Sequence, residues 1–302
     1  MPLSEKSKAF IAVGLVSFFW GTTYLGIRIG VKYMPGLQLT AIRQFTAGAM
    51  VVGWFLAKGH RMPSPGELWK LAVMGLLLLG VGNGLLSWGE QYIPSGLAAI
   101  IAALSPLAIA LFSMLLLKGT RLTPRILAGL LLGLAGVIVI FYNRIKSPAG
   151  NTFLPGIALC LLAVTGWGWG SVFIARHKLK LDVLYATGWQ MLLAGILLFP
   201  ASYLSGQAVP LQEIAVNGWM AVLYLIFFGS LVGYVAYVYA LSKLPPTRVS
   251  IYAYINPIVA ILLGWQVLDE SLSLSMAAGS AVALAGIYLV NSGFKKQIAA
   301  KK

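Results

Sequence analysis

Ten long apolar stretches dominate the pattern of the chain, and polar residues fall mainly between them. A bilayer is crossed by about 20 apolar residues in a helix, because a helix satisfies its own backbone polar groups without water. The pattern therefore predicts an all-α, polytopic membrane protein with ten transmembrane helices and short loops. The predicted spans are residues 9–31, 37–57, 68–93, 95–117, 126–142, 154–175, 183–204, 219–241, 247–268 and 274–290.

Composition supports a membrane location. Hydrophobic residues make up 59% of the chain and charged residues 10%, and the mean hydropathy is +0.87. These values lie outside the range of soluble globular proteins. The net charge of +15 could indicate a nucleic-acid binder, but such proteins gather their basic residues on one soluble face. Here the basic residues lie in short loops, so we expect the lipid bilayer, and no nucleic acid, as a partner.

The basic residues are distributed unevenly between the two sides of the predicted membrane. The N-terminus and the loops after even-numbered helices hold most of the 22 Lys and Arg residues. The opposite side holds Lys32, Arg144 and Lys146, and no other loop cation. Since cytoplasmic loops are enriched in Lys and Arg, both termini are predicted to be cytoplasmic. The first span is too long for a secretory signal and lacks a small-residue cleavage site, so it is predicted to remain as a helix.

Short sequence patterns recur about half a chain length apart. The matches are Trp20-Gly21 with Trp169-Gly170, Ile93-Pro94 with Leu244-Pro245, Ser105-Pro106 with Asn256-Pro257, and Leu134-Ala135-Gly136 with Leu284-Ala285-Gly286. They predict two repeats, residues 1–146 and 147–302, with five helices each. Because five is odd, the second repeat would enter the membrane upside down, giving an inverted repeat.

Five motifs in this order resemble those of a known family. They are the Trp20-Gly21 pair, AIRQFTAG around Arg43, PSGLAAIIAALSP, its counterpart PPTRVSIYAYINPIVA, and the Leu-Ala-Gly endings of the fifth and tenth spans. The chain resembles a duplicated EamA domain, a ten-helix member of the drug/metabolite transporter superfamily, over essentially its whole length. The resemblance implies a carrier of the bacterial inner membrane, commonly an exporter of amino acids or related metabolites, that works by alternating access. It does not identify the substrate.

The centres of the predicted spans indicate where a substrate would bind. Inverted-repeat carriers place their site near the bilayer midplane, and the span centres here carry aromatic, small or amide side chains where lipid-facing centres would be aliphatic. Two deeply placed tyrosines also need partners for their hydroxyl groups. The predicted substrate-binding residues are Trp20, Asn83, Trp167, Ser230, Tyr234, Tyr252 and Asn256. The two asparagines could instead serve as hydrogen-bonding contacts between helices.

Pro106 and Pro257 fall in the middle of predicted helices. A proline there removes one backbone hydrogen bond and kinks the helix. We expect both to act as kinks, with a role in gating or in lining the cavity as the alternative.

Glu90 is the only charged residue between Leu71 and Leu117. Counting residues from the outer surface places Glu90 and Arg43 at similar depth, and an intramembrane charge needs a partner or a watery cavity. We therefore predict a Glu90–Arg43 contact that holds two helices together at the outer gate. Binding of a substrate amine and proton coupling are the alternatives for Glu90, and Arg28 is a third charge near this level.

No catalytic or cofactor-binding pattern stands out. His60 and His177 fall in loops, no Cys or His pair has metal-ligand spacing, and the single Cys160 forms no intrachain disulfide. We expect a carrier without cofactor or metal, as a monomer or a homodimer. A channel and a lipid-processing membrane enzyme are the alternatives of another class. A largely uncharged, partly aromatic cavity suits small amphiphiles such as amino acids, with sugars as the runner-up.

Overall fold

The computed structural model describes residues 4–116, 123–145, 150–177, 179–244, 249, 252–270 and 274–299. All regular structure in these residues is helical. In the first half the elements are α1 (Glu5–Gly30), α2 (Gly36–Ala57), α3 (Pro65–Gly75), η1 (Leu76–Gly84), α4 (Leu85–Gly89), α5 (Ser95–Ala102), α6 (Ser105–Leu116) and α7 (Pro124–Ile145). In the second half they are α8 (Gly150–Arg176), α9 (Val183–Leu204), η2 (Leu211–Glu213), α10 (Val216–Tyr224), η3 (Leu225–Tyr234), α11 (Val235–Lys243), α13 (Tyr252–Leu268) and α14 (Leu274–Ala299).

These elements form ten membrane-crossing units. Seven helical stretches of the described chain are long and apolar enough to span a bilayer, and three shorter apolar helices accompany them. The predicted all-α class and the ten helices are confirmed, so the chain is a multi-pass membrane protein. The predicted boundaries at Leu117 and Thr247, and Pro245 of the repeat match, lie outside the described residues.

Three of the units are not plain α-helices. The third consists of α3, η1 and α4 in sequence, and the eighth of α10, η3 and α11; η1 and η3 are both π-helical. The fourth unit, predicted as one helix, ends as α5 at Ala102 and restarts as α6 at Ser105. Pi-helical segments and helix breaks leave backbone groups free for other partners and often mark functional sites.

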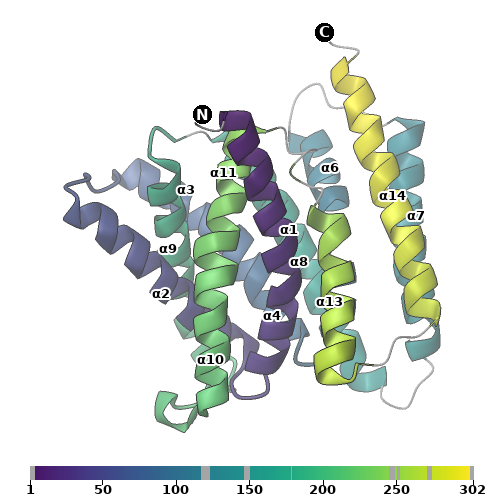
Figure 1. The fold of residues 1–302 in the computed structure, drawn as a ribbon, viewed down its shortest axis with the longest axis horizontal. Helices are drawn as coiled ribbons and strands as arrows, with labels where there is room; N and C mark the ends of the chain where they lie inside the picture. The colour runs from purple at the N-terminus through teal and green to yellow at the C-terminus, as the bar shows by residue number, and fades with distance from the viewer. Residues whose placement is uncertain are drawn as a thin grey trace.

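Figure 1 shows the arrangement of the helices around α1 and α8. The helix α1 begins and α14 ends at the same end of the bundle; we call this the upper end, and the opposite one the lower end. Both α1 and α8 are central: α1 packs against α13 and the α10–η3–α11 unit, and α8 packs against α6, α5 and the α3–η1–α4 unit. The helix α2 packs on α9, and α7 and α14 lie side by side at one edge.

The α2–α9 contact depends on two glycines. A methyl group on Gly48 would lie 2.2 Å from the backbone nitrogen of Leu192, and one on Gly195 would lie 2.4 Å from that of Phe45. Small residues allow two membrane helices to approach until their backbones touch. The two glycines are therefore required for this crossing.

The α7–α14 contact is built in the same way. A methyl group on Gly136 would lie 2.5 Å from the nitrogen of Ala283, and one on Gly286 would lie 2.5 Å from that of Gly133. Each helix thus presents a glycine to the backbone of the other.

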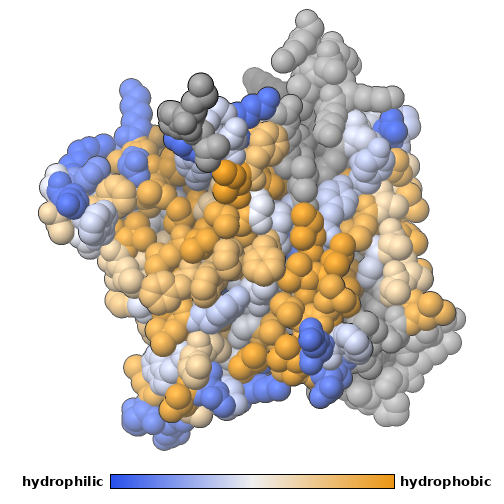
Figure 2. Space-filling model, in the orientation of Figure 1, coloured by the Kyte–Doolittle hydropathy of each residue, from blue (hydrophilic) through white to orange (hydrophobic). Residues whose placement is uncertain are grey.

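The surface of the bundle suits a lipid environment. Figure 2 shows a broad band of apolar residues across this face, with hydrophilic residues gathered toward its two ends. Large apolar side chains such as Phe18, Trp265 and Leu262 are more than half exposed. Such exposure is unfavourable in water and expected against lipid.

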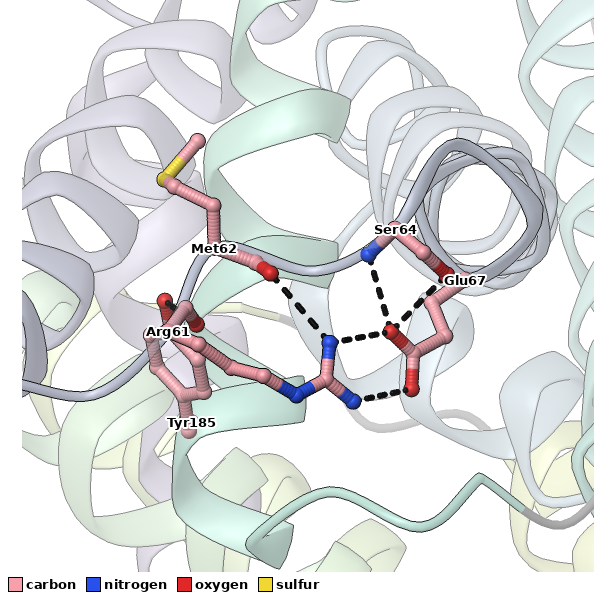
Figure 3. A network of polar contacts seen from close by, with 5 residues as sticks. All are labelled: Arg61, Met62, Ser64, Glu67 and Tyr185. Carbon is pink, nitrogen blue, oxygen red and sulfur yellow. Dashed lines mark hydrogen bonds and ion pairs between the residues drawn. The ribbon is translucent and has the colours of Figure 1, made fainter.

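A polar network at the upper end shapes the start of α3 (Figure 3). Ser64 and Glu67 form a capping box, and Glu67 also accepts two hydrogen bonds of 2.9 Å from the Arg61 guanidinium. The hydroxyl of Tyr185 on α9 donates to the carbonyl of Arg61 at 3.1 Å. Pairing with Glu67 raises the pKa of the Arg61 side chain. The network fixes the loop between α2 and α3 but lies far from the bundle centre.

Candidate functional site

A small cavity lies in the centre of the bundle, between α1 and α8. Its walls come from both halves of the chain. The lining residues are Trp20, Thr23, Tyr24 and Ile27 of α1, Arg43 of α2, Gly82 and Asn83 of η1, Leu86 of α4, Ala102 of α5, Ser105 of α6, Ala163, Val164 and Trp167 of α8, and Tyr252 of α13.

Aromatic rings form one wall of the cavity. Trp20 is the centre of the group, with ring centroids 5.4 Å from Trp167, 5.3 Å from Tyr252 and 5.0 Å from Tyr237. The contacts of Trp20 with Trp167 and Tyr252 are edge-to-face, a favourable geometry for aromatic rings. Both tryptophans lie at the middle of their helices, so the two halves of the chain meet here.

Each tryptophan packs on the π-helical segment of the opposite half of the chain. Trp20 donates its Nε1–H to the carbonyl oxygen of Gly229 in η3 at 3.1 Å, and lies against Gly233 so closely that a methyl group there would be 2.4 Å from Nε1. Trp167 lies against Gly82 of η1, where a methyl group would be 3.0 Å from its ring. The glycines of η1 and η3 therefore make room for the aromatic wall.

Arg43 reaches the cavity from α2. It is buried, and its Nε donates to Ser230 Oγ of η3 at 2.8 Å. Ser230 Oγ in turn donates to Gln44 Oε1 at 3.3 Å. Further along η3, Tyr234 donates its hydroxyl to Gln190 Oε1 of α9 at 2.6 Å. Thus η3 holds polar side chains of both α2 and α9.

The predicted site residues fall into two groups. Four of them line the cavity and three lie behind its wall. Those on the cavity are Trp20, Asn83, Trp167 and Tyr252, and those behind it are Ser230, Tyr234 and Asn256. The amide of Asn256, with its nitrogen oriented to donate, bonds the carbonyl of Ser17 at 2.8 Å and that of Tyr252 at 3.1 Å. Asn256 therefore joins α13 to α1 by hydrogen bonds, which is the role that the sequence offered as the alternative to substrate binding.

Sequence reasoning did not single out Thr23 and Tyr24. They follow Trp20 by three and four positions, and residues at these spacings share one face of a helix. Ile27 continues the same face. The face of α1 that carries Trp20 could therefore have been extended by periodicity alone.

The two prolines occupy different local structures. Pro106 is the second residue of α6, directly after the break in the fourth unit, and its neighbour Ser105 lines the cavity. Pro257 lies inside α13, which runs through it without interruption. The helix break therefore accompanies Pro106 and not Pro257, although the two positions match in the repeat.

The predicted contact between Glu90 and Arg43 is not formed. Arg43 points into the cavity toward Ser230, whereas Glu90 is fully buried at the end of α4. Neither carboxylate oxygen of Glu90 has a hydrogen-bond partner among the described residues. Arg43 lies on the central cavity, whereas Glu90 lies beside Arg28 at the end of α4, and this separates the two residues.

Arg28 is the basic residue that lies beside Glu90. Its Nη1 donates to the backbone carbonyl of Glu90, and its Nε lies 3.9 Å from Glu270 Oε1. The carboxylate of Glu270 also accepts from Ser95 N and Ser95 Oγ at 2.9 Å, and from Gly96 N at 3.3 Å. These contacts join α1, α4, α5 and the end of α13 at the lower end of the bundle.

Gln38 makes a second lower-end contact. Its amide nitrogen donates to the carbonyl of Val209 at 2.6 Å, and its amide oxygen accepts from Val209 N at 2.9 Å. Gly36 N donates to Gln91 Oε1 at 3.1 Å beside it. The lower end is therefore held by hydrogen bonds between helix ends and loops, and those of Gln38 with Val209 join the two halves.

The cavity is small in this conformation. Its volume is about 60 Å³, which is room for a few water molecules. Pockets that hold metabolites are several times larger. Binding of a metabolite therefore requires the helices around the cavity to move apart.

Comparison with known proteins gives a consistent result. The model of the EamA-like transporter family matches residues 7–142 and 154–292. An uncharacterized inner membrane transporter of Escherichia coli, YedA, is 37% identical over 265 residues, with 87% of this chain and 84% of YedA covered. Protein PecM of Dickeya dadantii is 28% identical over 277 residues, with coverage of 90% and 88%.

The fold is also found among solved structures. One crystal structure superposes with a TM-score of 0.65 at 24% sequence identity, covering 94% of this chain and 96% of the other. The family model covers most of both halves of the chain, and the helices that it matches are the ones that enclose the cavity. The chain is therefore a membrane transporter that belongs to the EamA-like transporter family.

Proposed function

We propose that the chain is a secondary transporter that moves small amphiphilic metabolites, amino acids or related compounds, out of the cytoplasm by alternating access. The single observation that carries the proposal is the central cavity with its aromatic wall, enclosed by helices of both halves. A few polar groups within apolar walls are typical of sites for small molecules. We place the protein in the bacterial inner membrane, like the relative YedA.

The two halves are proposed to be inverted repeats with boundaries near residue 146. Two sets of contacts support this. In the α2–α9 crossing, Gly48 meets Leu192 just as Gly195 meets Phe45, and each pair of positions is related by one constant shift along the sequence. The α7–α14 crossing repeats the relation with its own glycines. Reciprocal contacts of this kind are what a two-fold axis between the halves produces.

The upper end is proposed to face the cytoplasm. The described residues at this end include basic side chains of several loops, among them Lys58, Arg61 and Lys180. Cytoplasmic loops carry this excess. The lower end, closed by Arg28 and Glu270, would then be the outer gate, and export would require these contacts to separate once the substrate is bound.

Counterflow tests the proposal. Protein in liposomes loaded with unlabelled phenylalanine should accumulate radiolabelled phenylalanine transiently from outside, because a carrier exchanges substrate through one site. Trp20→Ala and Trp167→Ala should reduce this flux at least about tenfold, since each removes part of the cavity wall. The control is Trp265→Ala, which removes an exposed tryptophan of α13 and should leave flux unchanged.

The outcomes separate the candidate classes. Saturable counterflow with a sugar and not with amino acids would replace the substrate class and retain the carrier. Flux that neither saturates nor shows counterflow would indicate a channel and overturn the proposal. For orientation, single cysteines at Lys180 and Gln207 in a Cys160→Ala background should be labelled from opposite sides of the membrane, Lys180 from the cytoplasm.

A further inference from the structure

The side chain of Arg43 is unusual among the charged groups of this protein. Its side chain is only 3% exposed, yet it lines the central cavity. Among the described residues that line this cavity, Arg43 alone carries a charge. Within the described chain it makes one hydrogen bond, from Nε to Ser230 Oγ at 2.8 Å. An arginine has further N–H donors on its two terminal nitrogens. No hydrogen bond from these terminal nitrogens is found within the described chain, so they are available to a ligand that enters the cavity.

No acidic side chain neutralises Arg43. The chain has 7 Asp and Glu residues, and all of them belong to the described part of the structure. The ion pairs found there involve Glu5, Glu67 and Glu270, each with another base. A buried charge without a counter-charge is strongly unfavourable. A ligand that brings a negative charge into the cavity would remove that cost.

The guanidinium is held in a fixed position. Ser230 bonds it on one side, and Gly229 lies so close that a methyl group there would be 2.6 Å from Nη2. Both residues belong to η3, whose π-helical turn also exposes the Gly229 carbonyl to Trp20. The fork of N–H groups and the ring of Trp20 are therefore positioned by one segment. Fixed donors around a ligand lower the entropy that is lost on binding.

We propose that Arg43 binds the carboxylate group of the transported molecule, and that the substrate is a small monocarboxylate with an apolar or aromatic body. The planar fork of an arginine matches two carboxylate oxygens, and such paired, charge-assisted bonds are strong. The aromatic rings of Trp20, Trp167 and Tyr252 take up the apolar body. This inference rests on the proposed transport function.

A phosphate-bearing substrate fits less well. A phosphate monoester carries a charge of about −1.5 to −2 at neutral pH and attracts more than one cation. No second Lys or Arg is among the described residues that line the cavity. One arginine balances one carboxylate, so the charge of the site selects a monoanionic group.

The site offers no acidic group for an amine. The described lining residues include Asn83, Ser105 and Tyr24, which are uncharged. An ammonium group near Arg43 would be repelled unless the same molecule also carried a carboxylate. The recognised feature is the carboxylate, supplied either by a free acid or by the carboxylate end of an amino acid.

Three probes with the same aromatic body separate these possibilities. Purified protein in detergent is titrated with 3-phenylpropionate, phenylalanine and phenethylamine, and binding is read from the rise in melting temperature. We expect both acids to stabilise the protein and the amine to have no effect. Stabilisation by phenylpropionate alone would identify a free acid, and stronger stabilisation by phenylalanine would identify an amino acid. Equal stabilisation by the amine, or none by either acid, overturns the proposal.

Variants assign the effect to Arg43. Arg43→Gln should weaken binding of the acids about 10- to 100-fold, the loss expected for charge-assisted hydrogen bonds. Arg43→Lys, which keeps the charge but not the fork, should fall between it and the wild type. Gly229→Ala keeps the arginine and displaces its fork, so it should weaken binding even if Arg43→Gln does not fold. Unchanged affinity in Gly229→Ala and Arg43→Lys together would contradict the assignment.

The control is Arg61→Gln, which removes an exposed arginine outside the cavity and should leave binding unchanged. Counterflow of phenylalanine distinguishes the two proposals. If wild-type and Arg43→Gln proteins exchange phenylalanine equally, the carboxylate site is wrong and the transport function stands. If the acids bind through Arg43 but no compound is exchanged, the site stands and the transport function is wrong.

Discussion

The lower and upper ends of the bundle are both held by charged residues, but in different surroundings. At the lower end, the Glu270 side chain is 12% exposed and accepts three hydrogen bonds from Ser95 and Gly96. At the upper end, the ion pairs of the described residues are Lys8 and Lys243 with Glu5, all at least 42% exposed, and Arg61 with Glu67, which lies within one loop and the start of α3 and has an Arg61 side chain that is 62% exposed against 16% for Glu67.

The difference predicts which end opens more easily. The upper-end pair that joins the two halves, Lys243 with Glu5, is exposed and contributes little because water and salt screen it, whereas the shielded Glu270 carboxylate accepts backbone N–H groups across the halves and contributes strongly. The lower end is therefore the more firmly closed of the two. If the protein works by the proposed alternating access, we expect it to rest with its lower end closed until a ligand shifts the balance.

The largest expected effect is that of Glu270→Ala. It removes three hydrogen-bond acceptor contacts at the start of α5 and the partner of Arg28, so we expect a loss of ~3 kcal/mol in the free energy of unfolding. Chemical denaturation in detergent micelles measures this loss. The matched control is Glu213→Ala, an exposed acid at the same end, which should have no effect. If Glu270→Ala and Glu213→Ala are equally stable, the Glu270 contacts do not make the lower end the more firmly closed one.

Gln38→Ala should have the next largest effect. It breaks the two-way contact with the backbone of Val209 and leaves the partly buried N–H and carbonyl of Val209 unpaired, which costs about 1 to 2 kcal/mol. A cysteine at Val209 should at the same time become more reactive toward a water-soluble thiol reagent. Gln207→Ala, in the same loop but exposed, serves as control. Unchanged reactivity would show that the Gln38 contact does not hold the lower end.

Glu90→Gln tests a buried carboxylate of the lower end that has no hydrogen-bond partner among the described residues. Its two oxygens are buried without hydrogen bonds among the described residues, so removal of the charge should not destabilise the protein and should stabilise it by up to ~1 kcal/mol. Glu270→Gln should instead lower stability. If both variants lose the same amount, Glu90 has a partner in the prevailing conformation and the proton-coupling alternative weakens.

The smallest effect is expected at the upper end. Arg61→Ala breaks its pair with Glu67 but leaves the capping box of Ser64 and Glu67 in place, so the melting temperature should change within the error of the measurement. Any change should vanish at high salt. A large and salt-independent loss would mean that the Figure 3 network holds α3 and α9 together through more than the exposed pair.

The helices could be read from the hydrophobic pattern, but their internal interruptions could not. The predicted span 219–241 is within the observed unit of α10, η3 and α11, yet nothing in its apolar sequence indicated the π-helical segment. The break between Ala102 and Ser105 had a signal in Pro106, but the same signal at Pro257 gives no break. A proline permits a break, and the contacts of the neighbouring helices decide whether it forms.

The residues around the cavity could likewise be predicted only in part, because contacts between helices decide which side chains meet. Of the residues that midplane depth selected, Trp20, Asn83, Trp167 and Tyr252 line the central cavity, because depth follows from counting residues along a helix; that they bind substrate stays a prediction. Depth failed for Glu90 and Arg43, because Arg43 lines the central cavity whereas Glu90 lies at the end of α4, beside Arg28 at the lower end of the bundle. Which neighbours a side chain meets depends on the helix faces that pack together, and a single sequence with mostly apolar faces carries little information about this.

By itself, then, the sequence determined that the chain crosses a membrane ten times and that aromatic and amide groups lie at mid-depth. The physical reason is local: each span must satisfy its own backbone in lipid, so length and hydropathy are sufficient. Only the tertiary structure decided that Arg43 faces the cavity without a counter-charge, that Arg28 and not Arg43 lies beside Glu90, and that Glu270 closes the lower end. These facts depend on glycine contacts such as those of Gly48 and Gly229, which set how the helices turn toward one another.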